Sequence, residues 1–261
     1  MQFDVLTLFP EFFDAALLGV TGRAFRELGH ALNTHNLRSF ADNPHGHVDD
    51  APFGGGPGMV LCPNVLKQAV ESVPTVAPRK VIHFSPAAQP LTHAKVLELA
   101  GLSQLVLICT RYEGVDQRAI ELYADEEYSI GEAVVSGGDL PALFLIDAVC
   151  RWLPGVLGNS ESLEQDSFAN GLLDHPHYTR PDVFEGVPVP EVLRSGDHAA
   201  VARWRLRESM ARTKRLRPDL WETYLKDRLK DLPRPDQWSA WQVEHPEDWD
   251  RDKPKGWKGL G

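Results

Sequence analysis

Four stretches of the chain carry residues whose types and order could do chemistry. The first spans 49–59 and reads DDAPFGGGPGM, with four glycines between 54 and 58. Such a backbone can adopt positive φ and approach a ligand closely. The stretch lacks the GK[ST] of a P-loop and the G-x-G-x-x-G of a dinucleotide site. It therefore predicts either a ligand-contacting loop or a loop that is only mobile.

The second stretch, CTRYEGVD over 109–116, directly follows an apolar run. A polar turn after a strand is where α/β proteins place ligands. Arg111 and Glu113 flank Tyr112, and their charges could grip an amino-acid moiety or an RNA. The alternative is an ordinary strand–turn–helix connection in which Asp116 is the N-cap.

The third stretch, YSIGEAVVSGGDLP over 128–141, begins like a strand and is interrupted by Gly131. A Gly-Gly turn then leads into a helix, for which Asp139 is the expected N-cap. Glycine within a strand often marks close approach by a backbone or a ligand. An adenine ring could be held there by main-chain groups.

The fourth stretch is DAVCRWLPGVLG over 147–158, followed by an acidic segment. Arg151 lies at the expected helix end, and Glu161, Glu164 and Asp166 come after it, so these charges could meet at a cleft. Taken singly, each is better interpreted as a surface charge.

Metal and hydrolase sites are not indicated. His45 and His47, and likewise His175 and His177, form H-x-H pairs without further Cys or His at diagnostic spacing, so we predict no metal site. A G-x-S-x-G nucleophile elbow is absent from the sequence.

Expected strands and helices, which must position these residues, alternate over about the first 155 residues. Near-continuous apolar runs predict strands covered on both faces, hence a parallel sheet within an α/β domain. The stretches between these strands have apolar residues at helical spacing, which predicts helices, and Gly101 is expected to end one of them. The strands are expected at 3–9, 80–84 and 104–110, and the helices at 92–100, 116–124 and 139–153.

The second part of the chain differs in character. The polar, acidic stretch 158–169 predicts a linker or mobile loop, and a basic helical region is expected from about Asp197. Eight Lys or Arg lie between Arg194 and Arg217, although the net charge is −10. They could form a phosphate-binding face or only a solvated helix. We expect no strands in this part and assign no structure after Leu232.

Composition excludes several classes of protein. Apolar runs fall far short of the roughly 20 residues of a membrane span, and the N-terminus lacks the basic start of a signal peptide. Three widely spaced cysteines do not form a disulfide framework, so we expect a cytoplasmic protein. The acidic net charge argues against indiscriminate coating of nucleic acid.

Together and in this order, the four stretches and DSFANGLLDHPHYTRP over 166–181 resemble the bacterial tRNA (guanine-N1)-methyltransferase family, TrmD. The resemblance runs from the first residue to about Leu220. It implies a SPOUT-type α/β fold, with a parallel sheet, a C-terminal trefoil knot and a small helical C-terminal domain. The implied domains are a knotted methyltransferase domain (1–159), a flexible linker (160–172), a helical tRNA-binding domain (173–246) and a tail of unknown role (247–261).

The resemblance also implies a function. A homodimer with active sites shared between subunits would transfer the methyl group of S-adenosylmethionine to N1 of guanine 37 of tRNA. Asp166 would be the general base, which the reaction needs because guanine N1 carries a proton. Arg151 would stabilise the negative charge that develops on O6. A role for Mg²⁺ is possible but cannot be derived.

Carried over by position, the resemblance assigns two sets of binding residues. The S-adenosylmethionine contacts would be Phe84, Ser85, Pro86, Thr110, Tyr112, Glu113, Gly114, Ile130, Gly131, Val135, Gly137, Gly138, Leu140 and Pro141. The tRNA contacts would be Gly55, Gly56, Arg180, Arg203, Arg205, Arg207, Lys214 and Arg215. The chain departs from the family pattern at four positions, with Ala51 for Arg, Phe53 for Tyr, His83 for Tyr and Thr110 for Gly.

Two competing hypotheses remain. A SPOUT enzyme could instead methylate a ribose 2′-hydroxyl or an rRNA base, although the stretch 166–181 belongs to the guanine-N1 enzymes. A non-catalytic RNA-binding or assembly protein would not need Asp166, Arg151 and the cofactor loops together. A measurement of cofactor binding separates the two classes.

Overall fold

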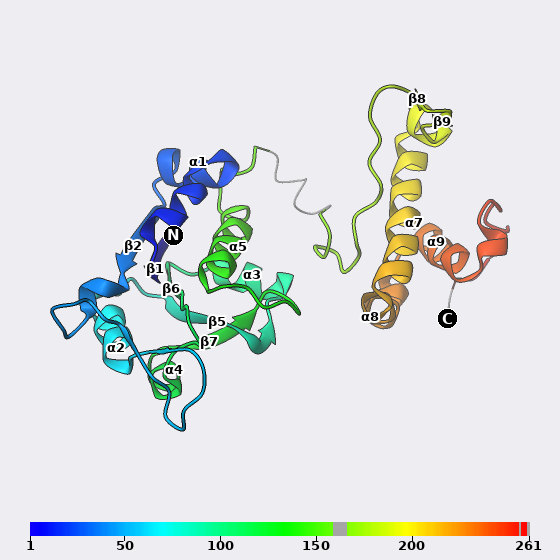
Figure 1. Ribbon diagram of the computed structural model, residues 1–261. Helices are drawn as coiled ribbons and strands as arrows, with labels where there is room; N and C mark the ends of the chain where they lie inside the picture. Colours follow the sequence, from blue (N-terminus) through cyan, green and yellow to red (C-terminus); the bar gives the residue numbers. More distant parts are fainter. Residues whose placement is uncertain (159–165, 256, 260–261) are drawn as a thin grey trace. The chain divides into compact units, whose positions relative to one another are not determined.

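A computed structural model describes residues 1–158, 166–255 and 257–259. The chain divides into two compact units, Met1–Gly158 and Asn159–Gly261 (Figure 1). Most of the predicted mobile loop 158–169, including Glu161 and Glu164, lies outside the described residues.

The first unit is built on a five-stranded, fully parallel sheet in the order β2-β1-β6-β5-β7. The three predicted strands are confirmed, although their ends are shifted. The strand-like start of the stretch 128–141 is also confirmed, as the end of a short strand, β7. β2 was missed because its sequence, ALNTHN, is polar and it lies at the sheet edge. The strands are β1 (Gln2–Thr7), β2 (Ala31–Asn36), β5 (Arg79–Pro90), β6 (Gln104–Ile108) and β7 (Glu126–Ser129).

Helices cover both faces of this sheet (Figure 1). One face packs against α1 (Gly19–Glu27), α3 (His93–Ala100) and α5 (Asp139–Cys150), together with the 3-10 helix η1 (Pro10–Leu17). The other packs against α2 (Pro63–Ser72) and α4 (Gln117–Tyr123). All five β6 residues are buried, as expected for a central strand covered on both faces.

Two of the predicted helix signals are confirmed. Asp116 caps α4, because its carboxylate accepts a hydrogen bond from the Arg118 amide at 3.0 Å. Gly101 ends α3, where its amide donates to the carbonyls of Glu98 and Leu99. Local capping chemistry was therefore sufficient to place these ends.

The second unit has a small core between three helices, α7 (His198–Leu216), α8 (Pro218–Arg228) and α9 (Arg234–Glu244). The basic helix predicted from about Asp197 is confirmed, with Asp197 as its N-cap. The core side chains include Leu172, Met210, Trp221 and Tyr224. Within the described part of the chain, no helix is long and apolar enough to cross a membrane.

Two expectations for this unit were wrong. A short antiparallel pair, β8 (Val183–Phe184) and β9 (Val187–Pro188), lies where no strand was expected; two-residue strands give no periodicity to detect. Structure also continues past Leu232, because α9 begins in a Pro-rich segment. Proline is tolerated in the first turn of a helix, so Pro235 does not prevent it.

Candidate functional site

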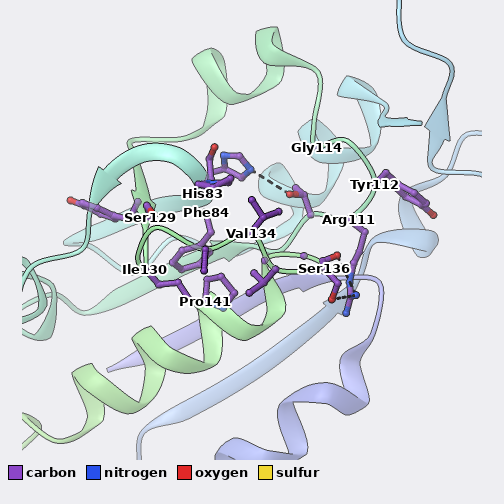
Figure 2. A pocket seen from close by; sticks show the side chains of 18 of the residues that line it. His83, Phe84, Arg111, Tyr112, Gly114, Ser129, Ile130, Val134, Ser136 and Pro141 are labelled. Carbon is purple, nitrogen blue, oxygen red and sulfur yellow. Dashed lines mark hydrogen bonds between the residues drawn. The ribbon is translucent and has the colours of Figure 1, made fainter. Parts of the chain in front are cut away.

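A cavity of about 270 Å³ opens beside the middle of β5, where its pairing with β6 ends, and at the carboxyl ends of β6 and β7 in the first unit (Figure 2). β5 and β6 stop pairing at His83 and Ile108, and the chain beyond them turns into the cavity wall. The loop between β7 and α5 closes the other side. This is the sheet edge at which parallel α/β folds bind ligands.

Most of the residues assigned to the cofactor line this one cavity. Gly131 and Leu140 do not; the Leu140 side chain is instead 48% exposed on α5. The wall also contains residues that the assignment omitted, among them Arg111, Val134 and Ser136. The assigned residues that line it are Phe84, Ser85, Pro86, Thr110, Tyr112, Glu113, Gly114, Ile130, Val135, Gly137, Gly138 and Pro141.

A close approach of two backbone segments shapes the cavity floor. The amide of Gly138 donates to the carbonyl of Thr110 at 2.8 Å. A Cβ on Gly138 would lie 2.8 Å from Cys109 Cα, and one on Gly137 would lie 2.8 Å from the Thr110 oxygen. The close approach between backbone segments is thus found at Gly137 and Gly138. A Cβ added to Gly131 would meet no atom within 4 Å.

A buried charge pair holds this floor in place. The Asp139 side chain is 1% exposed, and its Oδ2 accepts a hydrogen bond from Arg111 Nε at 2.8 Å. Its other oxygen accepts from Thr7 Oγ1 at 2.6 Å, and Arg111 also donates to Ser136 Oγ at 3.1 Å. The predicted N-cap role of Asp139 is therefore wrong, since Gly138 occupies the N-cap and the carboxylate is engaged by Thr7 and Arg111.

Two of the departures from the family pattern contact each other at the cavity. His83 Nε2 lies 3.4 Å from Thr110 Oγ1, and His83 Nδ1 lies 2.8 Å from Glu127 Oε2. Burial lowers the pKa of His83, and the Glu127 carboxylate opposes that shift. Two unusual residues thus form one hydrogen-bonded unit in the wall.

Part of the wall is apolar and open to solvent. Val134 is 86% exposed and Val135 is 38% exposed, although both line the cavity. Figure 2 shows Val134, Ile130, Phe84 and Pro141 gathered around the same space. Exposed apolar side chains around a hollow are typical of a ligand-binding surface.

The two proposed catalytic residues belong to different units. Arg151 is the half-buried C-cap of α5 in the first unit. Asp166 is half-buried in the second unit, and its carbonyl accepts a hydrogen bond from the Ala169 amide at 3.2 Å. The pairing of Asp166 with Arg151 stays a prediction.

The residues assigned to tRNA are two glycines of the first unit and six cations of the second, of which some are exposed and others have structural partners. Gly55 and Gly56 lie with positive φ in an exposed loop of the first unit, beside Phe53, which is 98% exposed. In the second unit, two cations have structural partners: Arg207 donates to the Trp249 carbonyl at 2.7 Å, and Lys214 to the Val243 carbonyl at 3.0 Å. The exposed cations are Arg180, Arg203, Arg205 and Arg215.

Comparison with known proteins gives the family. The profile of the family described as tRNA (Guanine-1)-methyltransferase TrmD matches residues 1–223. A tRNA (guanine-N(1)-)-methyltransferase of Neisseria meningitidis serogroup B is 53% identical over 225 residues, 85% of this chain and 90% of the relative. The one from Thiobacillus denitrificans is 51% identical over 229 residues, 85% of this chain and 97% of the relative. The match covers the whole sheet, the cavity and the start of the helical unit, so the chain belongs to the TrmD family of tRNA (guanine-N1)-methyltransferases.

Proposed function

We propose that this protein transfers the methyl group of S-adenosylmethionine to N1 of guanine 37 of tRNA, next to the anticodon. The observation that carries the proposal is the cavity at the sheet edge, which gathers most of the residues that the sequence resemblance assigns to the cofactor. Neither a purely RNA-binding protein nor an assembly factor needs such a cavity.

The chemistry of the cavity suits S-adenosylmethionine. Its volume of about 270 Å³ is close to the lower end of small-molecule sites, which begin at roughly 300 Å³. Ile130, Val134 and Pro141 offer an apolar surface for a purine ring, and Gly137 and Gly138 line the same cavity. When bound, the cofactor would supply an electrophilic methyl group.

The protein's own contribution would be a proton transfer and a charge. We assign Asp166 as the general base that removes the proton from guanine N1, since a protonated N1 is a poor nucleophile. Arg151 would stabilise the negative charge that spreads to O6. The family resemblance implies that both residues act in an active site shared between subunits.

The second unit would hold the tRNA. Arg203, Arg205 and Arg215 are exposed on α7, and Arg180 is exposed in the segment before β8, so these cations are available to phosphates. Specificity would come from an unstacked anticodon-loop base that enters the active site. We further propose a homodimer with shared active sites and a knotted first domain (1–159).

Cysteine chemistry agrees with the cytoplasmic location that we propose. Cys62, Cys109 and Cys150 are all free thiols. Cys109 is fully buried, and burial raises its pKa well above the ordinary value, so it is unsuited to be a nucleophile although it lies beneath the cavity.

The test is methyl transfer from labelled S-adenosylmethionine to unmodified tRNA transcripts, with the product nucleoside identified by mass spectrometry. One transcript carries guanine at position 37 preceded by guanine, and its partner carries adenine at 37. We expect N1-methylguanosine from the first transcript alone. Label on neither transcript, with cofactor binding intact, would move the substrate to another RNA, and label on both would remove the base specificity.

A further inference from the structure

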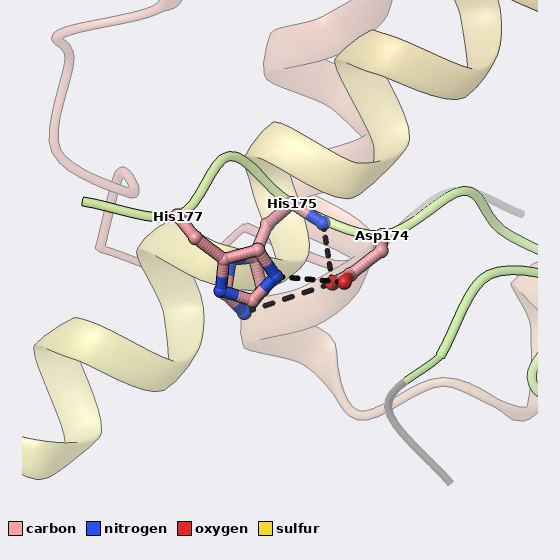
Figure 3. Close-up of side chains that lie close together, drawn as sticks. All are labelled: Asp174, His175 and His177. Atoms are coloured by element: carbon pink, nitrogen blue, oxygen red, sulfur yellow. Dashed lines mark hydrogen bonds and ion pairs between the residues drawn. The ribbon is translucent and has the colours of Figure 1, made fainter. Parts of the chain in front are cut away.

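Three potential metal ligands lie together in the segment that precedes β8 (Figure 3). One ligand atom from each of Asp174, His175 and His177 lies within 4.8 Å of the others. His177 Nε2 is 2.8 Å from Asp174 Oδ2, and His175 Nε2 is 3.9 Å from Asp174 Oδ1. Across residues 1–158, 166–255 and 257–259, no other three His, Cys, Asp or Glu side chains meet in this way.

The tautomer of His175 favours coordination. His175 Nδ1 lies 3.1 Å from the carbonyl oxygen of Pro176, which can only accept, so Nδ1 carries the hydrogen. In the neutral ring the lone pair is then on Nε2, the atom that faces Asp174. A backbone carbonyl that fixes the free nitrogen in this manner is the usual support of a metal-binding histidine.

The loop is held in place without a metal. The Leu173 amide donates to Thr213 Oγ1 at 2.8 Å, and the Asp174 amide donates to Ser167 Oγ at 2.9 Å. His175 is 8% exposed and packs edge-on against Trp204, with ring centroids 6.4 Å apart. Since these contacts already order the ligands, an ion would not have to offset the entropy of ordering the segment.

We propose that Asp174, His175 and His177 bind a divalent transition-metal ion of the Zn²⁺ type, with at least one coordination position left to water. One carboxylate and two imidazoles suit zinc, and zinc–ligand bonds of roughly 2.0–2.2 Å place tetrahedral ligand atoms about 3.3 Å apart. That separation lies between the 2.8 Å and 3.9 Å of the two nitrogen–oxygen pairs. Small side-chain rotations would complete the geometry.

Sequence reasoning missed this site because it looked for Cys or His partners at a distance. The third ligand is instead the acid directly before the H-x-H pair, in D-H-P-H. The other pair, His45 and His47, has ring centroids 5.7 Å apart but no third ligand atom within reach among the described residues. It is therefore a matched control with the same spacing.

The test is calorimetric titration of the full chain, freed of metal with a chelator, with ZnCl₂, together with Co²⁺ absorption in the visible range. We expect one ion per chain. His177→Gln keeps a hydrogen-bond donor for Asp174 but removes the imidazole, and His177 is exposed, so the fold should survive. Its Zn²⁺ affinity should fall by about 100-fold or more, since even second-shell losses cost roughly 10–100-fold.

Two further variants make the outcome decisive. His47→Gln should bind Zn²⁺ like the wild type, and His177→Cys should bind more tightly than His177→Gln because a thiolate also ligates zinc. Equal affinity of His177→Gln and the wild type, or no bound ion in either, would overturn the proposal. Loss of binding in His47→Gln alone would place the ion in the first unit and overturn it as well.

Discussion

The two units use charged side chains in opposite ways. In the first unit, Arg111 is paired with the buried Asp139, which also accepts a hydrogen bond from Thr7, at the base of the cavity. In the second, Arg203 and Arg205 project from α7 into solvent. The charged pair stabilises the structure of the first unit, whereas the exposed arginines give the second unit a positively charged surface.

This difference follows from the free energy of each arrangement. Removing one partner of a buried ion pair costs roughly 3–5 kcal/mol, because a buried charge is left uncompensated. An exposed ion pair contributes about 0–1 kcal/mol to stability. Arg203 and Arg205 can therefore serve binding without contributing much to stability, whereas Arg111 is needed to compensate the buried charge of Asp139.

The largest expected effect is on kcat, in a variant that should lose proton transfer by the second unit but keep cofactor binding by the first. Asp166→Asn should lower kcat by about 10²–10⁴-fold, the usual contribution of a general base. S-adenosylmethionine binding, measured by calorimetry, should stay unchanged because the cavity lies in the first unit. Asp227→Asn, at an exposed position of α8, is the control and should retain full activity. Equal loss of cofactor binding in Asp166→Asn would make Asp166 structural.

The next effect tests whether the first unit depends on close backbone packing. Gly138→Ala places a methyl group 2.8 Å from Cys109 Cα, so the turn must move. We expect a loss of stability of about 1–3 kcal/mol, typical of overpacking, together with loss of measurable cofactor binding. Gly158→Ala meets nothing within 4 Å and should change neither quantity. Wild-type binding by Gly138→Ala would show that the turn does not form the site.

Sequence predicted the parts of the fold that depend on local patterns. The continuous apolar run of β6 and the capped ends of α3 and α4 were found because neighbouring residues determine them. β2 and α9 were missed because the first is polar and the second begins among prolines. In both cases tertiary packing, rather than local preference, decides the structure.

The candidate site shows the same limit. The loops that follow the strands could be identified in advance, since parallel strands bring their carboxyl ends to one edge. The role of Asp139 could not, because its partner Thr7 is 132 residues away. The residue assignments came from the family resemblance, and Arg207, assigned there to tRNA, packs on Trp249, a residue beyond the matched range.

A smaller effect distinguishes two arginines of α7, one that stabilises the fold and one that we expect to bind tRNA. The guanidinium of Arg207 lies 4.2 Å from the Trp249 ring centroid, so Arg207→Ala should lower stability by about 1–2 kcal/mol in a denaturant titration. Arg205→Ala should leave stability unchanged. It should instead weaken tRNA binding and reduce the slope of log affinity against log salt by about 1. If Arg205→Ala unfolds the helix or leaves the salt slope unchanged, the exposed face is not the phosphate-binding surface.

The smallest effect concerns His83, whose burial lowers its pKa in the folded protein despite Glu127. Above the unfolded value of about 6.5 the ring is neutral in both states and costs nothing. As the pH falls below 6.5, the unfolded chain takes up a proton that the folded protein resists, so stability declines until the pH passes the lowered pKa. His83→Gln should therefore lose less stability than the wild type between about pH 7 and pH 5.5, measured by urea unfolding. His45→Gln, at an exposed position, should behave like the wild type. If His83→Gln instead loses more stability than the wild type, the ion pair with Glu127 outweighs burial, and His83 stabilises the cavity wall as a cation.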